Sequence, residues 1–389
     1  MPSLPSTKCS GCGACAQLCN KSAISMMPNA EGFLYPQVDS ELCVECKLCE
    51  KTCPVLNVKT STDFSERKAY AAICNDERIR LESSSGGIFT VLAEKIINEG
   101  GVVFGAEFDA DFSVRHGWTN SICELERFRG SKYLQSRTED TFLECRKFLN
   151  DGRKVLYAGT PCQIAGLKAF LKKDYENLFA VDVICHGVPS PALWQKYIEF
   201  CEKKSASRIV KTAFRRKNDG WKLYSLSFTF ANGSEYSVNQ SKGMWMLSFN
   251  KNVMMRPSCY DCIFKDSRIL SDITIGDFWG IQNYIPEKDD DKGYSICFLN
   301  TMNGEKFFES VKNSLSADEI KNYDCKRFNT QLLYSIELPK NRKKFISLCI
   351  NKGFDVAYKK YVKPKFHIRV YYACRRFGGK ILRNLGLRK

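Results

Sequence analysis

The sequence predicts a mixed α+β and α/β protein, in which a small cysteine-rich module precedes a larger α/β domain. The chain has 389 residues, which is longer than a single hydrophobic core usually stabilises, so more than one domain is expected. Eight cysteines lie within the first 53 residues, and strand-like and helix-like segments alternate from about residue 69 onward. We expect a module over 1–58, a large domain with regions 69–150 and 151–310, and a helical, basic extension over 311–389.

The amino-terminal cysteines form an internal repeat. The spacing C-x2-C-x2-C-x3-C occurs twice, 34 residues apart, at Cys9, Cys12, Cys15 and Cys19 and again at Cys43, Cys46, Cys49 and Cys53. Three cysteines on a tight loop can bind three irons of a cubane, and the fourth is placed to complete the other cluster. The predicted ligand sets are therefore Cys9, Cys12, Cys15 and Cys53 for one [4Fe-4S] cluster and Cys19, Cys43, Cys46 and Cys49 for the second.

Zinc is the alternative ligand for such cysteines, but zinc sites favour paired CxxC motifs and need only four ligands per ion. The segment between the two runs resembles the hairpin between the halves of a bacterial two-cluster ferredoxin. Asn20 departs from that resemblance, because the ferredoxins usually have proline there. This substitution leaves the number of ligands unchanged.

Composition indicates a metal-binding protein of the cytoplasm. The chain has 20 cysteines, and its amino terminus lacks the apolar run of a secretion signal, so metal binding is a better default than disulfides. No segment approaches the roughly 18 apolar residues that a spanning helix needs. The formal charge is +16, and eleven Lys or Arg but no Asp or Glu lie between Ala357 and Lys389.

Alternating patterns predict the elements of the large domain. Strands are expected at 69–75, 101–109, 113–119, 154–159 and 178–187, and helices at 88–100, 139–152 and 160–173. Residues 223–230 and 235–239 flank the turn ANGS and predict a hairpin. The alternation favours a sheet with at least some parallel strands, and the second half is more α+β in character.

A serine- and glycine-rich turn precedes the first of these helices. Ser85, Gly86 and Gly87 would present backbone N–H groups at a helix amino terminus, where phosphate is favoured. A plain helix cap explains the same residues. The turn matches neither GxGxxG nor a Walker motif, so the sequence by itself does not decide between the two.

Four cysteines of the large domain fall where they can meet. Cys162 begins a predicted helix, Cys185 ends a predicted strand, and Cys259 and Cys262 form a CxxC. Neighbouring strands deliver their carboxyl ends to one edge of the sheet, so these four can converge there. The spacing suits an iron–sulfur cluster or zinc equally, and a nucleophilic Cys162 assisted by His186 is a third reading. For His186 a structural role is favoured over proton transfer.

Six motifs, taken in order, resemble the coenzyme F420 hydrogenase/dehydrogenase beta-subunit family with a fused two-cluster ferredoxin. They are SSSGGIFTVLAEKIINEGGVVFGAEFD, GSKYLQS, GTPCQ, CHGVPSPALW, FRRKNDGW and RPSCYDCIFKDSRILSDITIGDFWG. The resemblance covers roughly residues 1–300. It implies FAD in the large domain and a third [4Fe-4S] cluster at Cys162, Cys185, Cys259 and Cys262. It also implies FAD contacts at Ser85, Gly86, Gly87, Lys132, Tyr133 and Gln135, and assigns no catalytic residue.

The resemblance predicts an iron–sulfur flavoprotein oxidoreductase. Clusters carry single electrons, whereas deazaflavins and nicotinamides give hydride, so FAD would connect a small-molecule hydride donor or acceptor to the clusters. The alternative is an electron-relay subunit that serves ferredoxin or another redox protein and has no substrate of its own. The basic tail is most simply a solvated segment. Weak contact with an anionic membrane is the second reading of it, which would place the protein at the membrane periphery, and nucleic acid is the least favoured.

Overall fold

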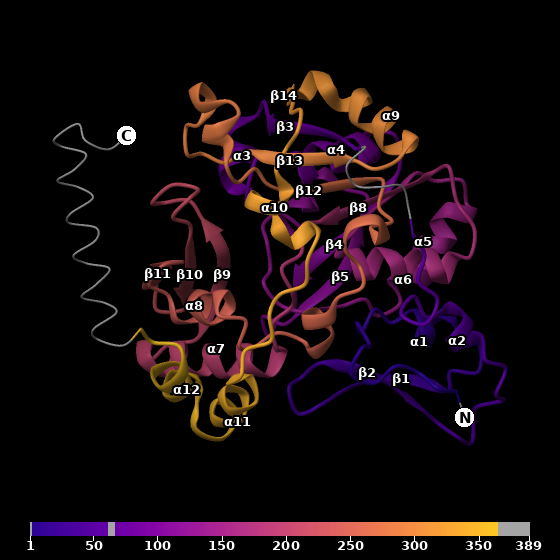
Figure 1. Ribbon diagram of the computed structural model, residues 1–389, viewed down its shortest axis with the longest axis horizontal. Coiled ribbons are helices and arrows are strands. Elements are labelled where there is room, and N and C mark those ends of the chain that lie inside the picture. The colour runs from indigo at the N-terminus through magenta and orange to yellow at the C-terminus, as the bar shows by residue number, and fades with distance from the viewer. Residues whose placement is uncertain (1, 61–66, 365–389) are drawn as a thin grey trace.

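The computed structural model describes residues 2–60 and 67–364 (Figure 1). Its amino-terminal module contains helices α1 (Ala14–Leu18) and α2 (Leu48–Thr52) and the antiparallel strands β1 (Ile24–Pro28) and β2 (Leu34–Val38). The duplication extends to the backbone, because Gly13 and Lys47, 34 residues apart, precede the two helices with φ of 78° and 59°. The predicted hairpin between the cysteine runs is present.

The large domain is built on one mixed sheet of nine strands, in the order β14-β3-β13-β12-β8-β7-β4-β5-β6. Strands β12, β8, β7 and β4 are parallel neighbours, and β5 and β6 are also parallel. The remaining pairs are antiparallel. The strands are β3 (Lys68–Cys74), β4 (Val102–Phe108), β5 (Val114–Thr119), β6 (Ser136–Arg137), β7 (Val155–Gly159), β8 (Leu178–Val183), β12 (Ile273–Asp277), β13 (Ser295–Leu299) and β14 (Leu315–Glu319).

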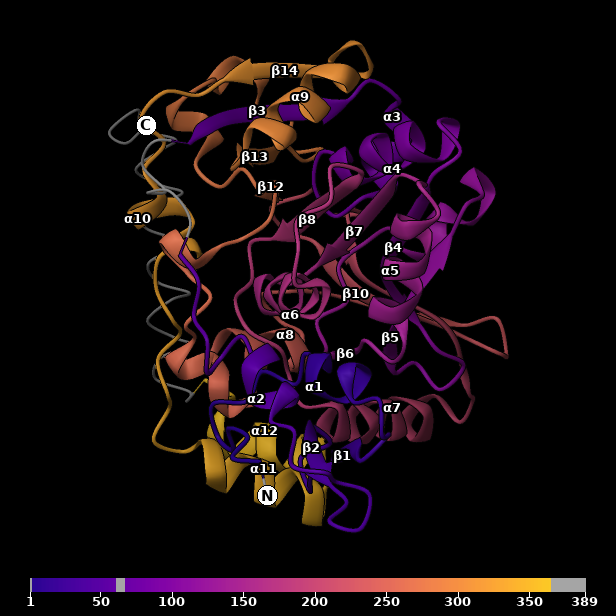
Figure 2. The same ribbon diagram turned by 90° about the vertical axis from the view of Figure 1, so that its right-hand side faces the viewer.

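Helices cover both faces of this sheet (Figure 2). One face packs on α4 (Ile88–Asn98) and α9 (Met302–Val311), and the other packs on α5 (Thr141–Asn150) and α6 (Pro161–Leu171). Alternate residues of each strand point to opposite faces, so Leu156 joins the first core and Val155 and Tyr157 join the second. Cys12 and Ala14 of the amino-terminal module belong to the second core, which attaches the module to α5 and α6.

A smaller antiparallel sheet has a core of its own. It contains β9 (Ile209–Arg216), β10 (Ser225–Phe230) and β11 (Glu235–Asn239), in which β10 and β11 are the predicted hairpin. Aromatic side chains pack it against α7 (Pro191–Ser205), α8 (Met244–Asn250), α11 (Arg342–Lys352) and α12 (Phe354–Tyr361). The short helices α3 (Glu77–Glu82) and α10 (Cys325–Phe328) complete the α-helices of the described chain.

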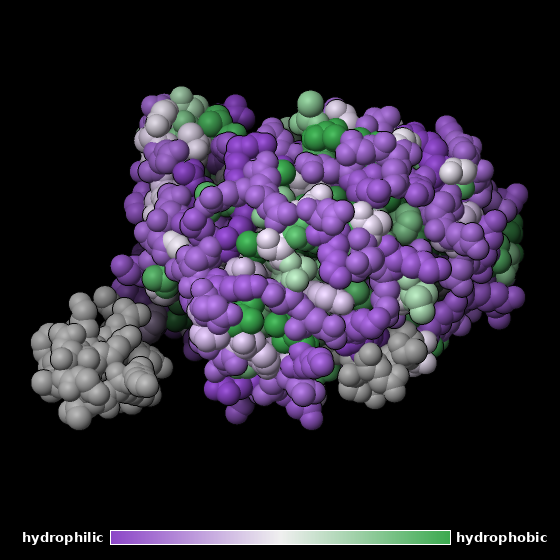
Figure 3. Space-filling view, turned by 90° about the horizontal axis from the view of Figure 1, so that it is seen from above, coloured by the Kyte–Doolittle hydropathy of each residue, from purple (hydrophilic) through white to green (hydrophobic). Residues whose placement is uncertain are grey.

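The segment after residue 310 differs from the predicted helical extension. It begins with a strand, β14, because Leu315 to Glu319 hydrogen-bond to the outer edge of β3 before α11 and α12 follow. Most of the basic tail lies beyond residue 364 and is outside the described residues. Among the helices described, none combines the length and apolar character needed to span a bilayer. Hydrophilic residues dominate the face seen in Figure 3, with hydrophobic ones in small scattered groups.

Candidate functional site: three cysteine sets and a cavity

The structure brings together the first predicted ligand set. Cys9, Cys12 and Cys15 lie on the loop and first turn of α1, and Cys53 ends α2; the thiols of Cys9, Cys12 and Cys53 interact electrostatically with that of Cys15. Burial raises the pKa of Cys12 to about 12 and also raises that of Cys15. A buried thiolate in this position therefore needs a cation to replace its proton, and a bound iron would supply that positive charge.

The second set lies between the end of α1 and the start of α2. Cys19, Cys43, Cys46 and Cys49 line one small cavity, closed on one side by Ile24 of the hairpin. Cys19 comes from the first run and the other three from the second, which is the crossed arrangement expected from the spacing.

The four cysteines of the large domain also meet in one cavity. Cys162 lies in the first turn of α6 after β7, Cys185 follows the parallel neighbour β8, and Cys259 and Cys262 flank the end of the short helix η3 (Pro257–Asp261). Burial raises the pKa of Cys162, and the neighbouring thiols raise it further. A nucleophilic cysteine needs a lowered pKa, so the environment disfavours the nucleophile reading.

Two buried cations face this cavity. Arg256 is 0% exposed and donates to the carbonyl oxygens of Cys9 and Leu34 and to Oε1 of Gln135, each at 2.8 Å. Lys265 is 6% exposed and donates to the carbonyl oxygens of Cys185 at 2.6 Å and Gln331 at 2.5 Å. Neither forms an ion pair with a carboxylate in the described chain. The cavity therefore suits an anionic group, and a cubane with four thiolates carries about 2 negative charges by valence counting.

Helix α6 touches two of the cysteine sets. Cys162 stands at its start, and Gly166, one turn later, lies against Cys12; a β-carbon on Gly166 would be 2.8 Å from Cβ and 2.9 Å from Sγ of Cys12. Only glycine permits this approach of the module to the helix. The first and third cysteine sets are thus neighbours along one helix face.

A cavity of about 520 Å³ adjoins the third set at the carboxyl edge of the parallel strands. Its wall includes Cys162 and Cys185, Ser10 and Gly11 of the amino-terminal module, and the turn before α4. This volume is in the range of cofactor sites, and the edge of the sheet is where α/β proteins bind ligands.

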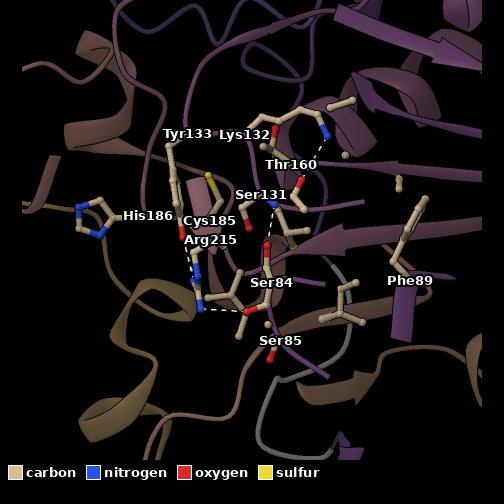
Figure 4. A pocket seen from close by; sticks show the side chains of 18 of the residues that line it. Ser84, Ser85, Phe89, Ser131, Lys132, Tyr133, Thr160, Cys185, His186 and Arg215 are labelled. Atoms are coloured by element: carbon tan, nitrogen blue, oxygen red, sulfur yellow. Dashed lines mark hydrogen bonds between the residues drawn. The ribbon is translucent and has the colours of Figure 1, made fainter. Parts of the chain in front are cut away.

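An ion pair forms part of the cavity wall. Arg215 of β9 binds Asp277 of β12 through two contacts of 2.8 and 2.9 Å. It also donates to the hydroxyl of Tyr133 at 2.9 Å and the carbonyl of Ser84 at 3.0 Å (Figure 4). These contacts fix Tyr133 and the turn before α4 in the cavity wall.

Comparison with protein families connects this geometry to known proteins. Residues 8–57 match the 4Fe-4S dicluster domain, and residues 152–322 match the C terminus of the coenzyme F420 hydrogenase/dehydrogenase beta subunit. Over these two segments the chain is similar to both families. It is thus an iron–sulfur protein related to an oxidoreductase subunit, as its motifs predicted.

Comparison with individual proteins adds little to the family matches. Among solved structures, the chain is similar to a chain of the F420-reducing [NiFe] hydrogenase complex from Methanosarcina barkeri. The identity is 17%, the TM-score is 0.47, and the match covers 77% of this chain and 94% of the other. No curated protein matches the chain.

The family resemblance also predicted FAD contacts, and the structure places only some of them on the cavity. Ser85, Gly87, Lys132, Tyr133 and Gln135 line it. Gly86 does not, because its N–H is bonded to Oγ of Ser295 at 2.9 Å and its α-carbon packs so closely that a β-carbon would lie 2.3 Å from the carbonyl oxygen of Ala72. Gly86 therefore positions the turn against β3, and its N–H is not available for phosphate.

Other predicted contacts already have protein partners. The Ser85 hydroxyl donates to the carbonyl of Tyr294 at 2.5 Å, and the Gln135 amide donates to the carbonyl of Ser10 at 3.2 Å. Gln135 thus fastens the cysteine loop of the module to the cavity wall. Lys132 is different, because burial lowers its pKa to about 7 while its ammonium donates to three carbonyls at 3.2–3.4 Å.

Sequence reasoning missed Arg256, Lys265, Arg215 and Gly166. Arg215 and Arg256 do lie inside motifs of the beta-subunit family, FRRKNDGW and RPSCYDC, which was the available signal. Gly166 carried none. His186 lines both cavities, and its Nε2 lies 2.7 Å from Oδ1 of Asn252, so its structural role stays a prediction.

Proposed function

We propose that the chain is an iron–sulfur flavoprotein oxidoreductase with three [4Fe-4S] clusters and one FAD. In this proposal Cys9, Cys12, Cys15 and Cys53 bind one cluster, Cys19, Cys43, Cys46 and Cys49 the second, and Cys162, Cys185, Cys259 and Cys262 the third. The observation that carries it is the shared wall. Cys162 and Cys185 line both the four-cysteine cavity and the cavity of about 520 Å³, so a cluster and a flavin there would be neighbours.

The repeated triple spacing of the amino-terminal cysteines supports clusters over zinc there, because zinc sites favour paired CxxC motifs and need only four ligands per ion. The match of residues 8–57 to the 4Fe-4S dicluster domain also supports clusters. For the third set, the resemblance to the beta-subunit family favours a cluster over zinc.

The chain's own residues fit FAD in the large cavity. The first turn of α4, with Gly87 at its amino cap, supplies N–H groups for phosphate. When bound, FAD exchanges hydride with an organic molecule and single electrons with clusters. The protein's part is to hold the flavin at the third cysteine set and to exclude water from the path between them.

Anaerobic reconstitution tests this proposal. The full chain should contain about 12 irons and one FAD, on the cubane stoichiometry. About 8 irons with one zinc would contradict the third cluster. Cys162→Ser should remove one cluster and leave the two ferredoxin-type signals; an unchanged iron content would contradict the ligand assignment.

A reduction screen then separates the two functions. Reduced F420, NADH, NADPH and reduced ferredoxin are each mixed with the reconstituted protein under anaerobic conditions. Bleaching of the flavin by one of the first three supports an enzyme with a hydride-exchanging substrate. Exchange with ferredoxin only would favour the relay subunit.

A further inference from the structure

A second cavity, of about 210 Å³, lies between α2, α6 and the segment after the CxxC. Five cations line it: Lys51, Lys59, Lys168, Lys172 and Arg268. Among the residues that the structure describes, no Asp or Glu lines it, and none of the five side chains forms an ion pair with another described residue. A lysine on a convex surface is surrounded by water, which screens its charge. These five cations instead share one concave site, where their positive potentials add.

The position of the cavity indicates what the anion belongs to. Thr52 and Pro54, which line it, flank Cys53, and the neighbouring wall contains Ala165 of α6, three residues after Cys162. The cavity therefore lies directly outside the first cysteine set and close to the third. Its lining also includes the apolar residues Val58 and Phe264, so apolar and charged groups share the site as in transient protein interfaces.

We propose that this basic cavity is the docking site of a small acidic electron-carrier protein, whose carboxylates lie against its five cations. The inference rests on the proposed function, because it requires a cluster at Cys9, Cys12, Cys15 and Cys53. One electron passes between the carrier's redox group and that cluster, so one is oxidised as the other is reduced, and no bond is made or broken. Complementary charge raises the association rate and orients the carrier toward Cys53.

Charge reversal on α6 tests the proposal. Lys168→Glu/Lys172→Glu changes two cations near the carboxyl end of α6, and Lys203→Glu/Lys204→Glu makes the same charge change in the last turn of α7, away from the cavity. Each reconstituted full-length protein is mixed with a reduced acidic two-cluster ferredoxin in a stopped-flow apparatus. The ionic strength is varied from about 0.01 M to about 1 M, where the Debye length falls from roughly 30 to 3 Å.

The α6 variant should react at least about tenfold more slowly than wild type at low salt, and the α7 control less than about twofold. The difference should vanish at high salt, and the rate with dithionite should be the same in all three proteins. Lys168→Gln/Lys172→Gln gives a milder change in the same direction if the reversal impairs folding.

Equal low-salt rates for the α6 variant and the α7 control would overturn the proposal. A second result would also overturn it: the α6 variant keeps the wild-type ferredoxin rate but loses binding of inorganic phosphate or of a short oligonucleotide. The cavity would then serve another anion. Iron and FAD are measured in the same samples. A protein that lacks FAD but keeps the salt-dependent ferredoxin effect contradicts the proposed function alone, and the reverse result contradicts the docking site alone.

Discussion

Gly166→Ala should damage the cluster proposed at Cys9, Cys12, Cys15 and Cys53 while leaving the fold intact. The new methyl would lie 2.8 Å from Cβ and 2.9 Å from Sγ of Cys12. Because carbon atoms pack at about 3.5–4.0 Å, the cysteine loop has to withdraw by roughly 0.7 Å or more. Metal–ligand distances tolerate only about 0.2 Å.

The global stability should change much less than the cluster. Overpacking costs about 1–3 kcal/mol, and alanine in a helix regains about 1 kcal/mol relative to glycine. Denaturant unfolding of the variant should therefore show a loss of at most about 2 kcal/mol. Iron analysis should give fewer than the roughly 12 irons of the wild type, with the EPR signal of one ferredoxin-type cluster lost or altered.

Ala165→Gly serves as the matched control for this variant. It removes a methyl group from the preceding residue of α6, and it costs about 1 kcal/mol of helix stability without moving Cys12. The control should keep all its iron. A Gly166→Ala protein with full iron content and an unchanged EPR spectrum would refute the reasoning that the close approach of α6 holds the cysteine loop.

Two further predictions concern buried charges. Arg256→Met should lower the free energy of unfolding of the reconstituted protein by about 3 kcal/mol, because three acceptors lose a charged donor. The same substitution should lower the free energy of unfolding of the apoprotein by less, because without the anionic cluster the buried arginine charge is uncompensated and its removal costs less. Equal losses in the two forms, measured by denaturant unfolding, would contradict this compensation. Burial raises the pKa of Asp182 to about 7, so the folded state holds its proton more tightly than the unfolded state, and stability should fall as pH rises from about 4 to 7. The full effect is about 4 kcal/mol, and Asp182→Asn should abolish it in apoprotein unfolding measured across this pH range; an unchanged pH profile would show that another group is responsible.

Patterns that are local in sequence predicted most of the fold. The strands and helices of the parallel region follow from hydrophobic periodicity, and the hairpin at 223–239 follows from its turn residues. The order of strands did not follow, and β14 was expected to be helix, because pairing with the edge of β3 is decided by a segment more than 200 residues away. Propensity does not report which edge a strand will find.

The predicted sites divide in the same way. Cys162 and Cys185 were brought together by the parallel order of β7 and β8, which alternation made predictable, and Cys259 and Cys262 reach the same cavity from η3. The FAD contacts depended on resemblance, and there the structure removes Gly86 from the cavity and commits Gln135 to Ser10. A motif shows which residues recur together, whereas hydrogen bonds show which atoms are already used.

The sequence by itself determined the ligand spacing, the duplicated module and the similarity of residues 152–322 to the beta-subunit family. These depend on residues close together in the chain or on ordered motifs. Only the tertiary structure decided that Arg256 binds the carbonyl of Cys9, 247 residues away, that Gly166 touches Cys12, and that five cations share one cavity beside Cys53. The physical reason is that burial, charge compensation and close approach arise from packing between distant segments, which no local pattern encodes.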